Sequence, residues 1–139
     1  MAGISRDLGA PGQSEFVPPG LAKAMEYLES HYEQPLAPAG LADIAGLHPA
    51  RFARLVKRIY RLTPNQLILQ TRLSAAAKLL SDTKDSLADI ACACGFYDHS
   101  AFTRAFRSAT KMTPTQFRSM LRETAVATQD QSRSRKKQS

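Results

Sequence analysis

The sequence has little cysteine and none of the short motifs that mark common catalytic or metal sites. Cys92 and Cys94 are its only cysteines, so they cannot build a disulfide framework. It has no CxxC, no HExxH and no phosphate-binding glycine loop, and its three histidines are scattered. The sequence therefore predicts a buried, reduced cysteine pair, no metal site, no cofactor and no enzymatic activity.

Long apolar runs are also absent. No run approaches the roughly 18 residues that a membrane span needs, and the first 20 residues contain no apolar signal core. We therefore expect no membrane partner and no secretion. The apolar fraction of 43% excludes a wholly disordered chain, and 139 residues suffice for one ordinary domain or two very small ones packed together.

Acidic residues are missing from two stretches that are rich in lysine and arginine. The chain carries 19 Lys and Arg against 12 Asp and Glu, a net charge of +7. Five basic and no acidic residues lie between Pro49 and Arg61, and the same numbers lie between His99 and Arg122. Residues 20–47, in contrast, are net acidic. Two basic patches of this kind are expected of a protein that binds a polyanion.

Hydrophobic periodicity predicts helices throughout the middle of the chain and no strand. Leu21, Ala24 and Leu28, for example, recur at the spacing of one helix face. The two ends show no such pattern, so we expect a flexible segment over residues 1–20 and a basic, disordered tail over residues 123–139. The expected helices span about 21–32, 38–45, 49–60, 64–81, 86–94, 99–109 and 114–122.

Two of these helices share one start signal. Thr63 can cap the long helix, Pro64 takes its first position, and Gln66 stands at the capping-box position. The same letters, with one change, recur from Thr113 to Gln116. The helix that begins at Pro64 has a predicted length of roughly 27 Å at 1.5 Å per residue, which makes it the longest in the chain.

The chain carries two copies of one helix-turn-helix pattern, although its most visible repeat is out of register. The pentapeptide LADIA occurs at Leu41 and again at Leu87, an offset of 46, whereas the second helices match at an offset of 50. An alanine followed four residues later by a glycine recurs at an offset of 49, which leaves one inserted residue in the second copy. We take the echo of the five letters as partly chance.

Each element of this pattern has a physical role. Where two helices meet at a steep angle, a small residue is needed at the contact, and a glycine allows the positive φ of the turn. An aromatic residue further on then holds the second helix against the first. The residues predicted for the turn and its packing are Ala42, Gly46 and Phe52 in the first copy and Ala91, Gly95 and Phe102 in the second.

The second helix of each copy presents a face without acidic residues. Its predicted apolar stripe runs from Phe52 to Ile59 in the first copy and from Phe102 to Ala109 in the second. A merely solvated face normally mixes charges, whereas arginine, serine and threonine can read base edges and hold phosphates. The predicted DNA-contacting residues are Arg51, Arg54, Lys57 and Arg58 in the first copy and His99, Ser100, Thr103, Arg104 and Arg107 in the second. Arg61 and Lys111 are further outward-facing positions of the two faces.

The segments YLESHYEQPL, GLHPARFARLVKR, LTPNQLILQTRLSAAAKLL, SLADIACACGFYDHSAFTRAFR and MTPTQFR together resemble the DNA-binding domain of the AraC/XylS family of bacterial transcription regulators over residues 21–122. The resemblance implies an all-α, seven-helix, homeodomain-like domain. In it, two helix-turn-helix subdomains, about 38–59 and 87–109, are joined by a long central helix. The family's recognition positions fall on Ala50, Arg51, Ala53 and Arg54, and on His99, Ser100, Thr103, Arg104 and Arg107.

The same resemblance implies a function and a place in the cell. The chain is expected to bind double-stranded DNA sequence-specifically and to regulate transcription at the bacterial nucleoid in the cytoplasm, often as an activator that contacts RNA polymerase. A linker helix of about 27 Å can place both second helices in successive major grooves, about 34 Å apart on one face of B-DNA. We therefore expect binding as a monomer.

The sequence departs from the family pattern at several positions. Arg61 and Lys111 stand where the family usually has glycine, at a cost of about 1 kcal/mol each if they adopt positive φ. His48 and Ala37 replace the usual serine caps, each worth roughly 0.5–2 kcal/mol. Because two recognition positions of helix 49–60 are alanine, we expect helix 99–109 to contribute at least as much specificity.

Other functions fit parts of the sequence. A nonspecific or architectural nucleic-acid binder would use the same basic faces, but a regulator should prefer its site by more than about 10³. A DNA-repair or modifying enzyme is disfavoured because Cys92 lies in an apolar context. A helical protein-interaction domain would not need two acid-free faces. Most of the family carries an effector or dimerisation domain as well, so a stand-alone regulator and a piece of a longer one both stay open.

Overall fold

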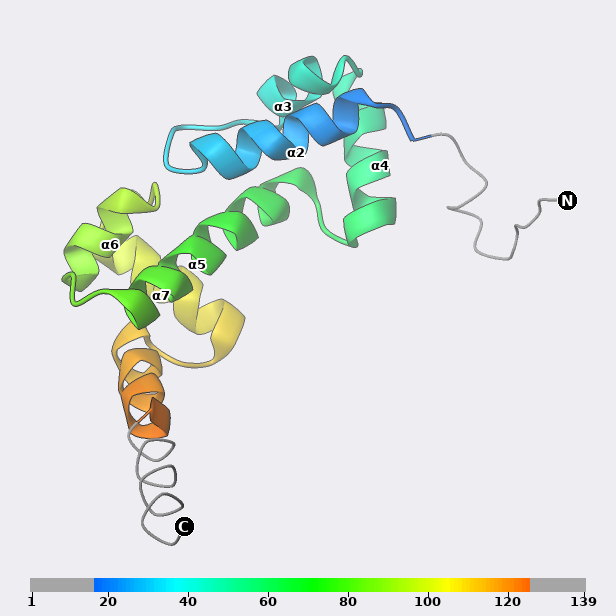
Figure 1. Cartoon of the computed structure of the whole chain (residues 1–139). Coiled ribbons are helices and arrows are strands. Elements are labelled where there is room, and N and C mark those ends of the chain that lie inside the picture. The colour runs from blue at the N-terminus through cyan, green and yellow to red at the C-terminus, as the bar shows by residue number, and fades with distance from the viewer. Residues whose placement is uncertain (1–16, 126–139) are drawn as a thin grey trace, which may run out of the picture. The chain divides into compact units, whose positions relative to one another are not determined.

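The computed structural model describes residues 17–125, which form seven helices and no strand (Figure 1). The predicted all-α fold is therefore confirmed. No helix in the described range is both long and apolar enough to cross a bilayer. The helices are α2 (Gly20–His31), α3 (Pro38–Ala45), α4 (Pro49–Tyr60), α5 (Pro64–Asp82), α6 (Leu87–Ala93), α7 (His99–Thr110) and a last helix over residues 114–125.

The chain divides into two compact units, with the boundary inside α5 between Thr71 and Arg72. Unit 1 contains α2, α3, α4 and the first part of α5, and unit 2 contains the rest of α5, α6, α7 and the last helix. Each unit holds one helix pair of the predicted repeat, α3–α4 in unit 1 and α6–α7 in unit 2. The long helix thus supplies side chains to both cores, Leu67 and Ile68 to the first and Leu73, Ala76 and Leu80 to the second.

Both ends of the described range contain more structure than the sequence predicts. Pro18 is buried, its carbonyl accepts a hydrogen bond from the Leu21 N–H at 3.1 Å, and α2 begins at Gly20. A Cβ at Gly20 would clash with the carbonyl of Ala45, so this glycine allows α2 and α3 to approach closely. At the other end the last helix continues past Arg122 to residue 125. The remainder of both predicted disordered segments lies outside the described residues.

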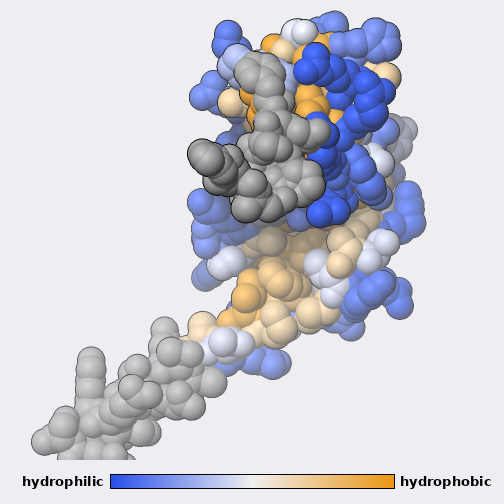
Figure 2. All heavy atoms as spheres, turned by 90° about the vertical axis from the view of Figure 1, so that its right-hand side faces the viewer, coloured by the Kyte–Doolittle hydropathy of each residue, from blue (hydrophilic) through white to orange (hydrophobic). Residues whose placement is uncertain are grey.

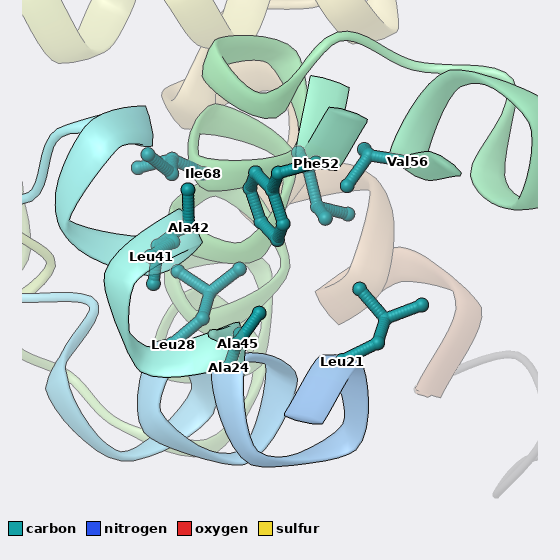
Figure 3. Close-up of a cluster of buried hydrophobic side chains, with 10 residues drawn as sticks. Leu21, Ala24, Leu28, Leu41, Ala42, Ala45, Phe52, Val56 and Ile68 are labelled. Atoms are coloured by element: carbon teal, nitrogen blue, oxygen red, sulfur yellow. The ribbon is translucent and has the colours of Figure 1, made fainter. Parts of the chain in front are cut away.

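The core of unit 1 forms where α2, α3, α4 and the start of α5 meet, and Figure 3 shows Phe52 at its centre. The Phe52 side chain is 1% exposed, and burying a side chain of this size is worth about 1.5–3 kcal/mol. The other members are aliphatic, which makes Phe52 the one aromatic residue of the buried cluster. The cluster consists of Leu21, Ala24, Leu28, Leu41, Ala42, Ala45, Phe52, Val56, Leu67 and Ile68.

The core of unit 2 contains a chain of phenylalanine rings instead. Phe102 lies with its ring centroid 5.2 Å from Phe96 and 5.8 Å from Phe106, and Phe106 lies 5.3 Å from Phe117 of the last helix. Phe102 and Phe106 are almost completely buried. Each such pair contributes about 0.5–1.5 kcal/mol beyond its buried area, so α7 is held on both sides, by the turn before it and by the helix after it.

Capping boxes start α5 and the last helix, as the sequence predicts. The Thr63 N–H donates to Gln66 Oε1 at 2.9 Å, and the Gln66 N–H donates to Thr63 Oγ1 at 3.1 Å. Thr113 and Gln116 make the same two bonds at the same two distances. Each box satisfies N–H groups that a helix start would otherwise leave unpaired, so both second helices of the repeat are followed by an equally well-defined helix start.

The end of α5 is closed by Arg118, which lies on the last helix. Its Nε donates to the Leu80 carbonyl at 3.2 Å, and its two terminal nitrogens donate to the carbonyls of Thr83 at 3.1 Å and Asp85 at 2.8 Å. The last carbonyls of a helix lack partners within it; in α5 the Leu79 carbonyl accepts from Thr83, and the Leu80 carbonyl accepts from Arg118. The guanidinium of Arg118 therefore fixes the path of the chain from α5 toward α6.

Candidate nucleic-acid interface

The turn between α3 and α4 is closed by Gly46 in the left-handed conformation. Gly46 has a φ of 73°, and its N–H and that of Leu47 donate back to the last turn of α3, Leu47 to the Ala42 carbonyl at 2.9 Å. Ala42 itself is fully buried. Only glycine takes this backbone conformation without strain, so the turn brings α4 directly back against α3.

The turn between α6 and α7 has the same construction. Gly95 has a φ of 89°, its N–H donates to the Cys92 carbonyl at 3.2 Å, and the Phe96 N–H donates to the Ala91 carbonyl at 2.9 Å. Ala91 is 1% exposed. The structure thus places the small residue and the glycine of both copies at corresponding points, and each second helix packs through its phenylalanine, Phe52 or Phe102.

Side-chain caps fix the starts of both second helices. His48 Nδ1 accepts a hydrogen bond from the Ala50 N–H at 3.2 Å, so the histidine acts as a cap of α4 in place of the expected serine. The carboxylate of Asp98, which the sequence did not single out, accepts from the Ala101 N–H at 2.7 Å and caps α7. Ala37 provides no side-chain cap for α3, as expected. The first turns of α4 and α7 are therefore held in place.

The outer face of α4 is cationic and exposed. Arg51, Arg54, Lys57 and Arg58 are all exposed, Ala50 is exposed as well, and α4 contains no acidic residue. Viewed from the side on which α4 lies, hydrophilic side chains gather over the upper part of the molecule (Figure 2). A hollow of about 680 Å³ is open beside them; its lining residues are Ala53, Arg54, Lys57, Arg58, Arg61, Thr63 and Pro64.

The outer face of α7 is more varied. His99, Ser100, Thr103 and Arg104 line an open hollow of about 300 Å³ at the start of the helix. Arg107 follows one turn later and is exposed. The face therefore combines hydroxyl, imidazole and guanidinium groups, which can donate to or accept from base edges, with cations suited to phosphate. Within each unit, the structure brings the predicted residues to one surface.

The residue that follows the end of each of these helices is also cationic, Arg61 after α4 and Lys111 after α7. Arg61 has a φ of 64° and Lys111 a φ of 67°, the only positive values for non-glycine residues in the described range. Each N–H donates to a carbonyl four residues earlier, at 2.9 Å from Arg61 and 2.8 Å from Lys111. This left-handed conformation costs about 1 kcal/mol relative to glycine, and the positive charge next to a helix C-terminus offsets part of it.

Two predicted apolar stripes end earlier than expected. Ile59 is 42% exposed and Ala109 is exposed, although the apolar spacing predicts that both lie on the buried faces of their helices. The last turns of α4 and α7 extend past the elements that cover Phe52 and Phe102. The spacing of apolar residues is therefore correct, but the core does not reach the ends of the two helices.

The cysteines differ from each other, so the predicted buried pair is wrong. Cys94 is fully buried, and burial raises the pKa of its thiol to about 11. Cys92, two residues earlier on α6, is exposed. In the described part of the chain, no three His, Cys, Asp or Glu side chains lie close enough to hold a metal ion.

Two helix pairs with tight glycine turns and acid-free second helices define a helix-turn-helix protein. Residues 41–120 match the model of a protein family described as "Helix-turn-helix domain", a range that runs from within α3 into the last helix. The chain belongs to this family, and it is similar to proteins of the AraC type.

Known proteins similar to this chain agree in fold and in stated role. The probable transcriptional regulator LumQ of Photobacterium leiognathi is 33% identical over 96 residues, 69% of this chain and 39% of LumQ. An AraC-type regulator structure from Chromobacterium violaceum has a TM-score of 0.71 at 28% identity, covering 81% of this chain and 96% of that one. The DNA-binding domain of AdpA, solved with a target DNA, shares the fold with a TM-score of 0.71 at 24% identity, over 75% of this chain and 94% of that one.

Proposed function

We propose that this chain is a sequence-specific DNA-binding regulator of transcription that reads its site through α4 and α7. The observation that carries the proposal is the presence, in both units, of a capped, acid-free second helix whose exposed face holds cationic side chains, with polar side chains in addition on α7. The described role of LumQ and the DNA bound to the AdpA domain support it.

The side chains divide by their place along each helix. The first turns of recognition helices usually contact base edges, and their later turns lie near the phosphate backbone. Accordingly, Arg51 and Arg54 of α4 read bases, as do His99, Ser100, Thr103 and Arg104 of α7. The cations that follow them bind phosphates; these are Lys57, Arg58 and Arg61 in unit 1 and Arg107 and Lys111 in unit 2.

The arrangement on DNA follows from having two such helices in one chain. We propose that a monomer places α4 and α7 in successive major grooves and that residues 21–122 are the DNA-binding part. Because the chain spans 39% of LumQ, it acts either alone or within a longer regulator. Activation through contact with RNA polymerase, in the cytoplasm, is the expected outcome of binding.

Selection of bound sequences from a random duplex pool tests this function. The expected result is one asymmetric site with two conserved elements about 10 base pairs apart, protected together in a footprint, and preferred over random DNA by more than about 10³. If random duplexes compete as well as the selected one, the chain is an architectural binder. If footprints cover a single groove segment, the proposed use of both helices is wrong.

A further inference from the structure

Tyr97 is the most exposed large apolar side chain in the described part of the chain. It is 94% exposed, whereas the next, Val17, is 46% exposed. Single exposed apolar residues are common on protein surfaces, so exposure by itself assigns no role. Tyr97, however, lies between the second turn and α7, so its exposed side chain is close in sequence to the predicted DNA-contacting helix.

Tyr97 is the one residue that the second copy has in addition to the first. Leu47 and Phe96 donate equivalent N–H bonds that end the two turns, at an offset of 49. The next equivalent residues, the caps His48 and Asp98, are related by an offset of 50. The hydrogen bonds therefore place the insertion between Phe96 and Asp98, where the sequence alone located it only within the connection.

Both neighbours of Tyr97 are anchored, so its own position is defined. Phe96 packs on Phe102 with ring centroids 5.2 Å apart, and Asp98 caps α7 through a bond of 2.7 Å to the Ala101 N–H. The Tyr97 side chain is exposed to solvent and lies two residues before His99, the first residue of α7. An exposed aromatic side chain therefore lies two residues before the helix whose first residues line the hollow.

We propose that Tyr97 contacts DNA at the edge of the groove that α7 enters, a contact without a counterpart in unit 1. The proposal rests on the function proposed above. Tyrosine hydroxyls commonly donate to phosphate oxygens, and the segment just before a recognition helix lies where the phosphate backbone passes its first turn. The acidic residue that follows Tyr97 in the chain, Asp98, accepts a hydrogen bond from the Ala101 N–H. The ring then covers a sugar, and the hydroxyl donates to a phosphate.

Three variants of the whole chain test the contact: Tyr97→Ala, Tyr97→Phe and, as a matched control, Met120→Ala. Met120 is another exposed apolar side chain of unit 2, 40% exposed, on the last helix. On the selected duplex we expect Tyr97→Ala to weaken binding about tenfold, because it loses a hydrogen bond to a charged group together with the ring contact. Tyr97→Phe should lose less, and Met120→Ala should change nothing. All three should unfold at the temperature of the original chain.

Two further readouts identify what Tyr97 touches. The salt dependence of binding should keep its slope in Tyr97→Ala, because a neutral side chain releases no counterion. Nitration of tyrosines, mapped by peptide mass spectrometry, should modify Tyr97 fastest in the free chain and be suppressed there by the selected duplex. Unchanged nitration at Tyr97 in the complex would overturn the proposal, as would unchanged affinity of Tyr97→Ala.

The failure of this inference is distinguishable from failure of the proposed function. If the original chain shows no preference for any duplex, the function itself is wrong. If the original chain discriminates and Arg104→Ala weakens binding while Tyr97→Ala does not, only the role of Tyr97 is wrong. Normal DNA binding by Tyr97→Ala with lost activation in a purified transcription reaction would assign the ring to a protein partner instead.

Discussion

In unit 1, α4 carries a row of arginine and lysine and has alanine at two of its expected recognition positions, whereas α7 of unit 2 carries histidine, serine, threonine and arginine. The backbone that presents these side chains is nearly the same in both, with a left-handed glycine, a capped start and a left-handed cation at the end. The turn chemistry therefore fixes where the helices point and leaves their outer faces free to differ in chemistry.

The inner faces differ as well. Phe52 is the single aromatic residue in an aliphatic cluster, while Phe102 belongs to a chain of four rings that reaches the last helix. Unit 1 has Ala37 before α3, without a side-chain cap, and unit 2 has Ser86 before α6, whose hydroxyl accepts from the Asp89 N–H at 3.0 Å. Unit 2 therefore has two stabilising features that unit 1 lacks, the row of phenylalanine rings and the side-chain cap of its first paired helix.

The largest expected effect comes from truncating the central ring of each core. Phe52→Ala and Phe102→Ala should each lower the free energy of unfolding by about 3–5 kcal/mol, and Phe102→Ala should be the costlier because it also breaks two ring contacts. Urea unfolding of both variants measures this. A smaller loss for Phe102→Ala than for Phe52→Ala would reverse the proposed ranking of the two cores.

Removing one guanidinium from each outer face should weaken sequence discrimination. We expect Arg104→Ala to reduce the preference for the selected duplex over a scrambled one by about 1–3 kcal/mol, at least as much as Arg54→Ala does, because α4 offers few other polar contacts to bases. Competition binding with both duplexes measures it, and Lys23→Ala, on α2, is the control. Loss of discrimination with Arg54→Ala alone would contradict the greater role of α7.

Either cap substitution alone should bring the first helices of the two pairs closer together in stability, and the two combined should reverse their difference. Ala37→Ser should raise the free energy of unfolding by roughly 0.5–2 kcal/mol, and Ser86→Ala should lower it by a similar amount. Thermal unfolding of the two variants and of their combination provides the measurement. No gain from Ala37→Ser would mean that Pro38 already supplies what α3 needs at its start.

Arg61 and Lys111, the two cationic residues with positive φ, should lower the free energy of unfolding and at the same time strengthen DNA binding. Arg61→Gly and Lys111→Gly should each stabilise the fold by up to about 1 kcal/mol, less the favourable interaction of the charge with the helix end. Each should also reduce the slope of binding affinity against salt by about 0.9. Arg61→Ala, which removes the charge and keeps the strain, is the control; if it stabilises as much as glycine does, strain is not the cause.

The smallest effect near neutral pH concerns the two cysteines of unit 2, of which Cys92 is exposed and Cys94 is buried. A colourimetric thiol reagent near neutral pH should label Cys92 quickly and Cys94 only after unfolding. Because burial raises the pKa of Cys94 from its ordinary 9.0 to about 11, the unfolded state loses this proton first, and stability should fall as pH rises from about 9 to about 11. Cys94→Ala should remove that part of the pH dependence; two fast-reacting thiols in the folded chain would contradict the assignment.

Much of the fold could be predicted because its determinants are local. Both capping boxes join residues three positions apart, Thr63 with Gln66 and Thr113 with Gln116. The sequence pattern therefore predicts them, and the structure contains both. The Ala–Gly spacing of the turns is equally short. The surfaces of α4 and α7 were found through the absence of acidic residues, which needs no knowledge of contacts.

The remaining features depend on partners that are distant in sequence or on the extent of the core. Arg118 finds its carbonyl acceptors 33 to 38 residues away, and no spacing rule points to them. The exposure of Cys92 and Ile59 depends on which neighbours reach them in three dimensions. The sequence does not single out Tyr97, because the spacing places the inserted residue only within the connection. Asp98 has a local signal, since aspartate is a common N-cap.

The bonds that Arg118 makes also set a lower limit on how short this domain can be. Its guanidinium holds three carbonyl groups around the exit from α5, and it stands on a helix that follows both helix pairs. A chain cut after Lys111 would keep every residue expected to touch DNA and yet release that exit. The last helix, although it lies outside both helix pairs, therefore stabilises unit 2 through these three hydrogen bonds. A shorter chain that kept only the two helix pairs would destabilise the DNA-binding surface of unit 2.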